Sequence, residues 1–393
     1  MPADCNAGQL EFEGLGSRKV TASFDGGAIT SNAGALLLRE TDRAIGLSRQ
    51  AAACFKDARS QEYVEHTLET LVAQRVHGIA LGYEDLNDHD DLRHDPVLGL
   101  VSGKLEARRS DCAVLAGKST LNRLEHAPKA AVDRYHKITV DSAAMKELFV
   151  SLFIQSKKSA PRRLILDLDA TDDPVHGDQE GRFFHGYYKC YCYLPLYIFC
   201  GRELLLAKLR PSNIDASAGA KEEIAWIVSR LRQKWPDVEI WLRADSGFCR
   251  EELMAWCEAN GVHYVFGLAR NARLEAGIEE ELAEAEQRAA KTGKAERIFK
   301  EFQYMTRKSW SRERRVAAKA EHLPKGANPR FIVTSLTSQA VKARTLYEKI
   351  YCARGGMENR IKECQPGCSR TAPRQQRLGQ TSSGCGSPRS PMC

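Results

Sequence analysis

Beyond residue 162 the sequence alternates short apolar runs with amphipathic helical segments, and this alternation constrains the fold more than any other feature. The runs comprise residues 164–169, 193–200, 203–209, 238–244 and 263–268, and the helical segments comprise residues 221–234 and 250–259. The second and third runs meet at Gly201-Arg202, which is a hairpin signal. This order predicts a mixed α/β or α+β domain.

The rest of the chain differs in pattern from this segment. Residues 1–158 read as a mostly helical region, and residues 159–365 as the domain that contains the alternating strands and helices. Three strands predicted near residues 297–306, 312–320 and 330–336 form an insertion at about 271–336, and a long helix is expected over residues 338–365. Residues 366–393 form a tail of different composition.

The composition is that of a globular protein, with 43% hydrophobic and 28% charged residues. No apolar run approaches the roughly 20 residues needed to cross a bilayer. The first thirty residues lack the basic and apolar pattern of a secretion signal, so a cytoplasmic location is expected. The thirteen cysteines are scattered along the chain, which favours reduced thiols in that compartment.

The formal net charge of +7 is mild, but basic residues concentrate between Lys291 and Arg330. This stretch contains twelve Lys/Arg and four Asp/Glu, a local excess of 12 − 4 = +8, together with Phe302, Tyr304 and Trp310. Basic residues interleaved with aromatic ones suit a nucleic-acid surface, whereas a solvated face is the alternative. We therefore expect phosphate contacts from the segment that contains Arg314, Arg315 and Lys319.

Two aspartates follow apolar runs directly. Asp169 ends the first run and Asp245 follows the fourth, and each is succeeded by small or polar residues. Phosphodiester chemistry with two Mg²⁺ ions requires several converging carboxylates, and strand ends can supply them. Asp167, on the same strand face as Asp169, is the main rival for this role. Asp172 and Asp173 are weaker rivals, and a simple turn-forming role is the alternative for each residue.

The last predicted helix has two distinct stripes at 3.6 residues per turn. The apolar stripe comprises Leu346, Ile350, Ala353, Met357 and Ile361, and the second comprises Tyr351, Arg354, Glu358, Lys362 and Gln365. The apolar stripe is expected to hold the helix against the sheet and to direct Glu358 towards its rim. An ordinary ladder of ion pairs would explain the charges but not the aromatic Tyr351 in line with them.

These residues together resemble the DDE transposases of bacterial insertion sequences. The resemblance rests on Asp169-Ala-Thr, on Ala-Asp245-Ser-Gly-Phe and on Tyr351-x2-Arg354-x3-Glu358, and it covers about residues 10–365. The motifs Phe184-His-Gly-Tyr-Tyr and Tyr193-Leu-Pro-Leu-Tyr belong to it as well. The match is to the branch of the family with a β-strand insertion between its second Asp and its Glu.

The resemblance implies a fold and a site. It implies an RNase H-like catalytic core with an inserted β-rich subdomain, and an N-terminal helical region that binds DNA ends. Asp169, Asp245 and Glu358 would be the catalytic metal ligands for two Mg²⁺ or Mn²⁺ ions. Tyr351, Arg354 and Lys362 would contact DNA. Trp310 would stack on a base near the cleavage site, with a buried aromatic of the inserted sheet as the alternative.

The resemblance also implies a reaction and its partners. The reaction is cut-and-paste movement of DNA with terminal inverted repeats, carried out at the bacterial nucleoid by a homodimer on paired ends. Another RNase H-like nuclease, such as a resolvase, is one alternative. A truncated, catalytically defective derivative that only binds DNA is the second.

Two departures from the family pattern lie at the end of the chain. Gln365 stands where related proteins often have Lys, seven residues after the catalytic Glu, and Lys362 is the substitute for its phosphate contact. The 28 residues after Gln365 contain no acidic or aromatic residue, no Ile or Val, and a single Leu. This composition indicates translation in another reading frame and predicts a disordered tail and a weakly active or inactive product.

Overall fold

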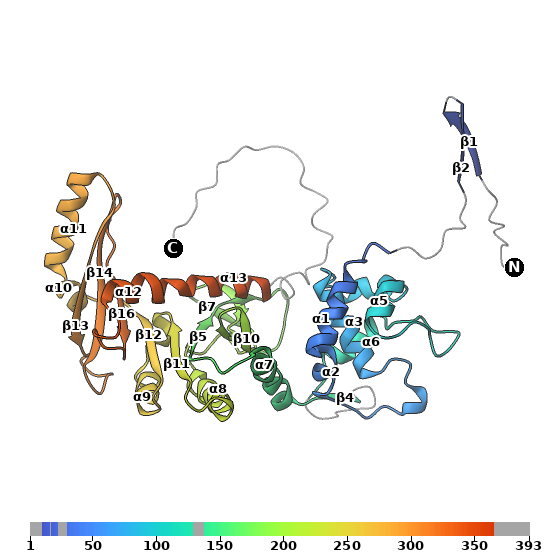
Figure 1. Cartoon of the computed structure of the whole chain (residues 1–393), viewed down its shortest axis with the longest axis horizontal. Coiled ribbons are helices and arrows are strands. Elements are labelled where there is room, and N and C mark those ends of the chain that lie inside the picture. The colour runs from blue at the N-terminus through green and yellow to red at the C-terminus, as the bar shows by residue number, and fades with distance from the viewer. Residues whose placement is uncertain (1–9, 16, 23–29, 129–136, 365–393) are drawn as a thin grey trace. The chain divides into compact units, whose positions relative to one another are not determined.

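The computed structural model describes residues 10–15, 17–22, 30–128 and 137–364. The chain divides into two compact units, Met1–Leu148 and Phe149–Cys393, coloured from blue to green and from green to red in Figure 1. The division falls inside helix α7 (Ser142–Ser156), earlier than the boundary expected at residue 158. The tail predicted to be out of frame, residues 366–393, lies outside the described residues.

The first unit is mostly helical. Its elements are β1 (Leu10–Leu15), β2 (Arg18–Ala22), α1 (Ala35–Ile45), α2 (Leu47–Ala52), β3 (Phe55–Asp57), η1 (Gln61–Tyr63), α3 (Leu68–Ala80), η2 (Leu86–Asp88), α4 (His89–Leu92), α5 (Pro96–Val101), α6 (Lys118–Glu125) and β4 (Ile138–Val140). Ala35, Leu98 and Leu115 lie at the centre of its core. The buried amide of Gln74 on α3 exchanges two hydrogen bonds with the backbone of Ala116, which fixes the segment before α6 to α3.

The second unit is built on one mixed sheet of nine strands. Its members, in chain order, are β5 (Arg163–Ala170), β9 (Leu196–Cys200), β10 (Glu203–Lys208), β11 (Glu239–Ala244), β12 (His263–Leu268), β13 (Glu296–Tyr304), β14 (Arg314–Leu323), β15 (Gly326–Ala327) and β16 (Arg330–Thr334). The spatial order is β10-β9-β5-β11-β12-β16-β14-β13, with β15 paired to β14. A separate small sheet has the order β6-β8-β7, formed by Asp173–Pro174, Cys190–Tyr193 and Phe183–His185.

Five of these strands have the arrangement of an RNase H-like core. β9 and β10 form an antiparallel hairpin through Gly201, whose positive φ of 63° suits glycine, and β9 runs antiparallel to β5. β5, β11 and β12 are parallel to one another. The expectation of a mixed α/β fold is confirmed.

The inserted strands do not form a sheet of their own. β16 pairs antiparallel with β12, and β14 and β13 follow it, so the insertion continues the core sheet beyond its fifth strand. Helices α10 (Ala272–Ala276) and α11 (Glu279–Thr292) belong to the same insertion, and α11 covers β13 and β14 (Figure 1). The expected insertion of β-strands is thus present, and edge pairing with β12 makes it part of the core sheet.

Helices cover both faces of the sheet. On one face, α8 (Ala220–Lys234) and α9 (Glu251–Ala259) pack with α7 residues against Leu164, Leu166 and Leu168 of β5. The predicted buried stripe of α8, Ile224, Ile227, Val228 and Leu231, is confirmed. On the other face lies the last helix, which crosses the sheet from the inserted strands to β9 (Figure 1).

This last helix is not a uniform α-helix. It comprises α12 (Ala343–Thr345), a π-helical turn η4 (Leu346–Tyr351), a 3₁₀ turn η5 (Cys352–Arg354) and α13 (Gly355–Cys364). Leu346, Met357 and Ile361 are buried as predicted, but Ala353 is exposed and Tyr347 is buried instead. The predicted stripe assumes a constant 3.6 residues per turn, and the π and 3₁₀ turns shift it.

The basic stretch is buried in the extended sheet. Arg314, Arg315 and Lys319 are only 4%, 8% and 7% exposed, because β14 lies between two strands and is covered on both faces. Arg314 pairs with Glu251 and Glu258. Arg315 pairs with Glu301, and Lys319 pairs with Glu321. In this structure the three predicted phosphate contacts are thus buried and paired within the protein rather than on a solvated face, and their contact with DNA stays a prediction.

Trp310 is buried as well. Its side chain is 8% exposed, and its ring meets that of Tyr304 edge to face at 5.7 Å within the main core. The Arg314 guanidinium lies over the Trp310 ring, 5.4 Å from its centroid. Its burial agrees with the alternative of a buried aromatic in the inserted segment, and stacking on a DNA base stays a prediction.

No helix among the described residues is long and apolar enough to span a membrane.

Burial makes Arg314 a stability determinant. Replacing it with Ala leaves Glu251 and Glu258 beside the core without their buried partner, so we expect the free energy of unfolding to fall by about 3–5 kcal/mol. Arg312 also pairs with Glu258 but its side chain is 58% exposed, so Arg312→Ala is a matched control that should cost about 1 kcal/mol or less. Urea unfolding of both variants measures the difference, and equal losses would contradict the buried placement of β14.

Candidate active site

Two strand ends bring Asp169 and Asp245 together. β5 and β11 are parallel neighbours, with Asp167 opposite Arg243 and Leu168 opposite Ala244, so their carboxyl ends lie at one edge of the sheet. Asp169 is the penultimate residue of β5, and Asp245 follows β11 directly. The Asp245 Oδ1 accepts a hydrogen bond from the Gly247 backbone N–H at 2.9 Å, which fixes the orientation of its carboxylate.

The last helix adds a cation to this edge. The Arg354 Nη2 lies 3.0 Å from the Asp169 Oδ1, and both side chains are 13% exposed. The backbone N–H of Ala170 donates to the same carboxylate oxygen. The Arg354 Nε is buried and has no hydrogen-bond partner within the described part of the chain. Arg354 therefore keeps one donor available beside the carboxylates.

Two further acidic groups act on the Asp169–Arg354 pair. Burial raises the pKa of Asp169, the charges of Asp245 and Glu358 raise it further, and the Arg354 guanidinium opposes them. Burial works against the charge of Arg354, but Asp169, Asp245 and Glu358 all help to hold the pKa of its guanidinium above the ordinary value. The site thus combines like charges that repel one another with the buried cation of Arg354.

The chemistry of this donor set fits a divalent cation. Carboxylate oxygens are the ligands that hard cations such as Mg²⁺ prefer, and a cation would relieve the repulsion that raises the pKa of Asp169. Glu358 is exposed on α13 and makes no hydrogen bond or ion pair with any described residue, so its carboxylate is available. Among the described residues no three His, Cys, Asp or Glu side chains are gathered closely enough to hold an ion, and Arg354 balances the charge of Asp169.

Asp167 has a different role from Asp169. Its two oxygens accept hydrogen bonds from the Arg243 Nε and Nη2, at 2.5 Å and 2.7 Å, and its side chain is 5% exposed. The Arg243 Nη1 donates to the Ile350 carbonyl in the π-helical turn at 2.5 Å. Asp167 therefore ties β5 to β11 and, through Arg243, to the last helix. The other rivals, Asp172 and Asp173, lie at the entry to the small three-stranded sheet.

Gly267 on β12 allows the last helix to approach the strand ends. A Cβ atom at this position would lie 2.6 Å from the Tyr351 Oη and 2.9 Å from the Ser246 backbone nitrogen. Only glycine therefore lets the Tyr351 hydroxyl reach the chain next to Asp245. Sequence reasoning missed this residue, although an isolated glycine inside a predicted strand is a signal of close backbone approach.

A cavity of about 330 Å³ adjoins this contact. Its lining includes Ser246, Gly267 and Tyr351, and two basic residues, Arg270 and Arg330. Both arginines are exposed. They give this cavity a positive charge.

The residues predicted to bind DNA are thus divided in space. Tyr351 and Arg354 lie at the carboxylate edge, and Lys362 is exposed on α13. Trp310, Arg314, Arg315 and Lys319 lie inside the extended sheet. Another residue near this edge, Tyr188, was not expected from the sequence. Its hydroxyl contacts the Ala170 carbonyl at 3.4 Å. Burial and the charges of Asp172 and Asp169 raise the pKa of Tyr188 to about 12.

The chain matches a known family over most of its length. The sequence model of the family described as "Transposase DDE domain group 1" matches residues 12–378, which is nearly the whole chain. No curated protein matches the chain. The family match includes both strand ends and the last helix.

Of the two aspartates of β5, we expect Asp167 to be needed for stability and Asp169 for DNA cleavage. Asp167→Asn leaves the Arg243 guanidinium buried without its counter-charge, so we expect a loss of about 3–5 kcal/mol in the free energy of unfolding. Asp169→Asn removes the partner of Arg354 but also relieves like-charge repulsion with Asp245 and Glu358, whose charges still act on Arg354, so its stability should stay within about 1 kcal/mol while DNA cleavage is lost. Thermal unfolding and cleavage assays on both variants test this. An Asp167→Asn protein that is stable but inactive would make Asp167 the functional carboxylate.

Substitution of Gly267 should disturb the site directly. The added methyl group of Gly267→Ala must displace the Tyr351 hydroxyl and the backbone of Ser246, so we expect loss of DNA cleavage and a destabilisation of about 1–3 kcal/mol. Gly356 on α13 has nothing within 4 Å of the position that a Cβ atom would take, and Gly356→Ala should stabilise the helix by about 1 kcal/mol. If both variants are equally active, the close approach at Gly267 has no role in the site.

Proposed function

This chain belongs to the DDE transposase family, and from this premise we propose that it cleaves the ends of an insertion sequence and transfers them to target DNA by a cut-and-paste route. The observation that carries the proposal is that Asp169 and Asp245 lie at the ends of two parallel neighbouring strands of an RNase H-like sheet, where Arg354 of the last helix pairs with Asp169. Fold and family support transposition, and the chemistry of this edge supports phosphodiester cleavage at it.

In this proposal Asp169, Asp245 and Glu358 hold two Mg²⁺ or Mn²⁺ ions. When bound, the ions supply activation of the attacking water or 3′-hydroxyl and stabilisation of the leaving oxygen. Asp245 is oriented by the Gly247 N–H, and Asp169 is held by β5 and by Arg354. The available carboxylate of Glu358 completes the set from the last helix.

Basic and hydroxyl groups around the carboxylates position the DNA. Arg354 has a buried donor without a partner among the described residues, which suits a phosphate oxygen next to the cleaved bond. Tyr351, Arg270 and Arg330 line the adjoining cavity and extend this surface along the DNA backbone. Lys362 is exposed one turn after Glu358, and it contacts the DNA strand on the other side of the carboxylates.

The partners follow from this reaction. The substrates are double-stranded DNA with terminal inverted repeats and a target duplex, and two copies of the chain bind the paired ends at the bacterial nucleoid in the cytoplasm. The first unit supplies the DNA-end-binding region. Residues 159–365 supply catalysis.

The test uses a plasmid that carries the gene together with the DNA that flanks it on both sides. Asp245→Ala should abolish Mg²⁺- or Mn²⁺-dependent cleavage at the flanking ends and leave DNA binding unchanged, because the carboxylate is needed for ions rather than for phosphate. Asp237→Ala, an exposed aspartate just before β11, makes the same change of charge and should cleave normally. Full activity of the Asp245→Ala protein would reject the site.

The same assay separates the alternatives. Joined products with target DNA indicate a transposase, whereas cleavage without joining indicates another nuclease of this fold. Specific binding of the ends without cleavage indicates a defective derivative, which the composition of residues 366–393 favours. In that case the reading frame restored after Gln365 should recover transposition.

A further inference from the structure

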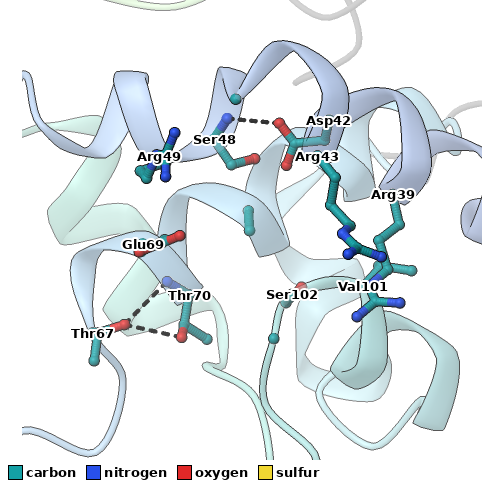
Figure 2. Close-up of a pocket in the computed structure, with 13 residues that line it drawn as sticks. Arg39, Asp42, Arg43, Ser48, Arg49, Thr67, Glu69, Thr70, Val101 and Ser102 are labelled. Carbon is teal, nitrogen blue, oxygen red and sulfur yellow. Dashed lines mark hydrogen bonds between the residues drawn. The ribbon is translucent and has the colours of Figure 1, made fainter.

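The first unit contains a cavity that the proposed catalysis does not use. It has a volume of about 660 Å³ and lies among α1, α2, the start of α3 and the end of α5 (Figure 2). Its lining lies within residues 39–103, so the first unit forms it alone. The volume is in the range of pockets that hold a ligand of nucleotide size, about 300–1,000 Å³.

Three arginines surround this cavity. Arg39 and Arg43 are one helical turn apart on α1, and Arg49 comes from α2, which places it across the cavity from the other two (Figure 2). Glu40 lies 3.2 Å from Arg43 and 3.9 Å from Arg39, but all of these groups are at least one-third exposed. Arg49 is exposed and makes no ion pair within the described ranges. Three guanidinium groups can therefore turn towards one bound anion.

The floor of the cavity supplies hydroxyl groups. Ser48 and Ser102 line it and are 3% and 4% exposed, and neither Oγ has a hydrogen-bond partner among the residues that the structure describes. An unpaired buried hydroxyl costs stability, so two of them in one cavity point to a ligand that accepts hydrogen bonds. The hydroxyls of Thr67 and Thr70 are paired with each other at 3.0 Å and close one end.

The two carboxylates in the lining do not make this a cation site. The Asp42 Oδ1 accepts a hydrogen bond from the Ser48 backbone N–H at 2.8 Å, so this group is used in the turn between α1 and α2. Glu69 is exposed in the first turn of α3, where the helix dipole favours an acidic residue. The lining itself therefore holds three arginines and two acids, and Glu40, which pairs with Arg39 and Arg43, lies outside it.

We propose that this cavity binds a phosphate of the DNA backbone, with Arg39, Arg43 and Arg49 as the charged contacts and the Ser48 and Ser102 hydroxyls as donors to its oxygens. That the phosphate belongs to DNA rests on the proposed function, whereas the recognition of a phosphate group rests on the residues of the cavity. Guanidinium groups bind phosphate oxygens in pairs of parallel hydrogen bonds, and hydroxyl donors complete the oxygen shell. The large volume leaves room for the sugars on either side of the phosphate.

The test measures binding of the full chain to a duplex made from its own flanking DNA over a range of salt concentrations. The double variant Arg43→Gln/Arg49→Gln should lower the slope of log affinity against log salt by about 0.9 for each phosphate that the protein no longer neutralises. The double variant Lys234→Gln/Arg288→Gln removes two exposed cations on α8 and α11 of the second unit, so it makes the same change of charge and should leave the slope unaltered. An unchanged slope in the double variant, with binding by the parent chain intact, overturns the proposal.

The buried hydroxyls give a second readout that does not involve charge. Ser48→Ala/Ser102→Ala should weaken DNA binding by about tenfold without changing the salt slope, because it removes donors and not cations. The same variant should melt at a higher temperature, since two unpaired buried hydroxyls are gone. Higher stability with unchanged affinity would show that the serines do not face a ligand.

Inorganic phosphate distinguishes the sources. If phosphate raises the melting temperature of the parent but not of Arg43→Gln/Arg49→Gln, and the DNA slope is the same in both, the cavity binds a free anion and the DNA source is wrong. If the parent chain binds and cleaves DNA, and neither the arginine variant changes the salt slope nor the serine variant changes the affinity, the phosphate site in this cavity is rejected and the proposed function stands. A parent chain that neither binds nor cleaves DNA rejects the proposed function, and the phosphate measurement still decides the cavity.

Discussion

The buried pair between Asp167 and Arg243 is the interaction on which the geometry of the second unit depends. It joins two parallel strands close to their carboxyl ends, and its third hydrogen bond reaches the Ile350 carbonyl of the last helix. A buried ion pair gains little net stability because both groups lose water. Its effect here is positional: it sets where the helix crosses the sheet, and hence which of its residues face Asp169 and Asp245.

The π-helical turn, which accepts a hydrogen bond from Arg243, also determines which residues of the last helix face the sheet. Leu346 and Tyr347 pack on the inserted strands, whereas Met357 and Ile361 pack on Tyr197 and Phe199 of β9. A regular α-helix would carry one apolar stripe across both surfaces, but the two surfaces lie at different angles around the helix. The π and 3₁₀ turns between them change the rotation, and Arg354 falls within that irregular segment. Single π-helical turns inside helices are frequently found at functional sites.

Much of the catalytic unit could be predicted from local patterns. The strand ends at Asp169 and Asp245 and the buried stripe of α8 follow from short-range periodicity, which the structure preserves. The position of β14 could not be predicted in this way. Its sequence, Arg-Arg-Val-Ala-Ala-Lys-Ala-Glu, has the charge of a surface strand, and only pairing with distant glutamates on α9 and β13 explains its burial. Gly267 was missed because its role depends on Tyr351, which is far away in sequence.

The continuity of the sheet through β12 and β16 has a consequence for how such an insertion can be gained or lost. A strand at the end of a sheet leaves a row of backbone N–H and C=O groups unpaired, which invites pairing with other chains. In this protein β16 covers that row on β12, and α11 lies over the new outer strands. A descendant without the insertion would therefore expose the unpaired backbone groups of β12 at the edge of its core sheet. It would aggregate unless another segment paired with that strand or covered it. The insertion is thus difficult to discard once acquired, so its persistence need not reflect any contact with DNA.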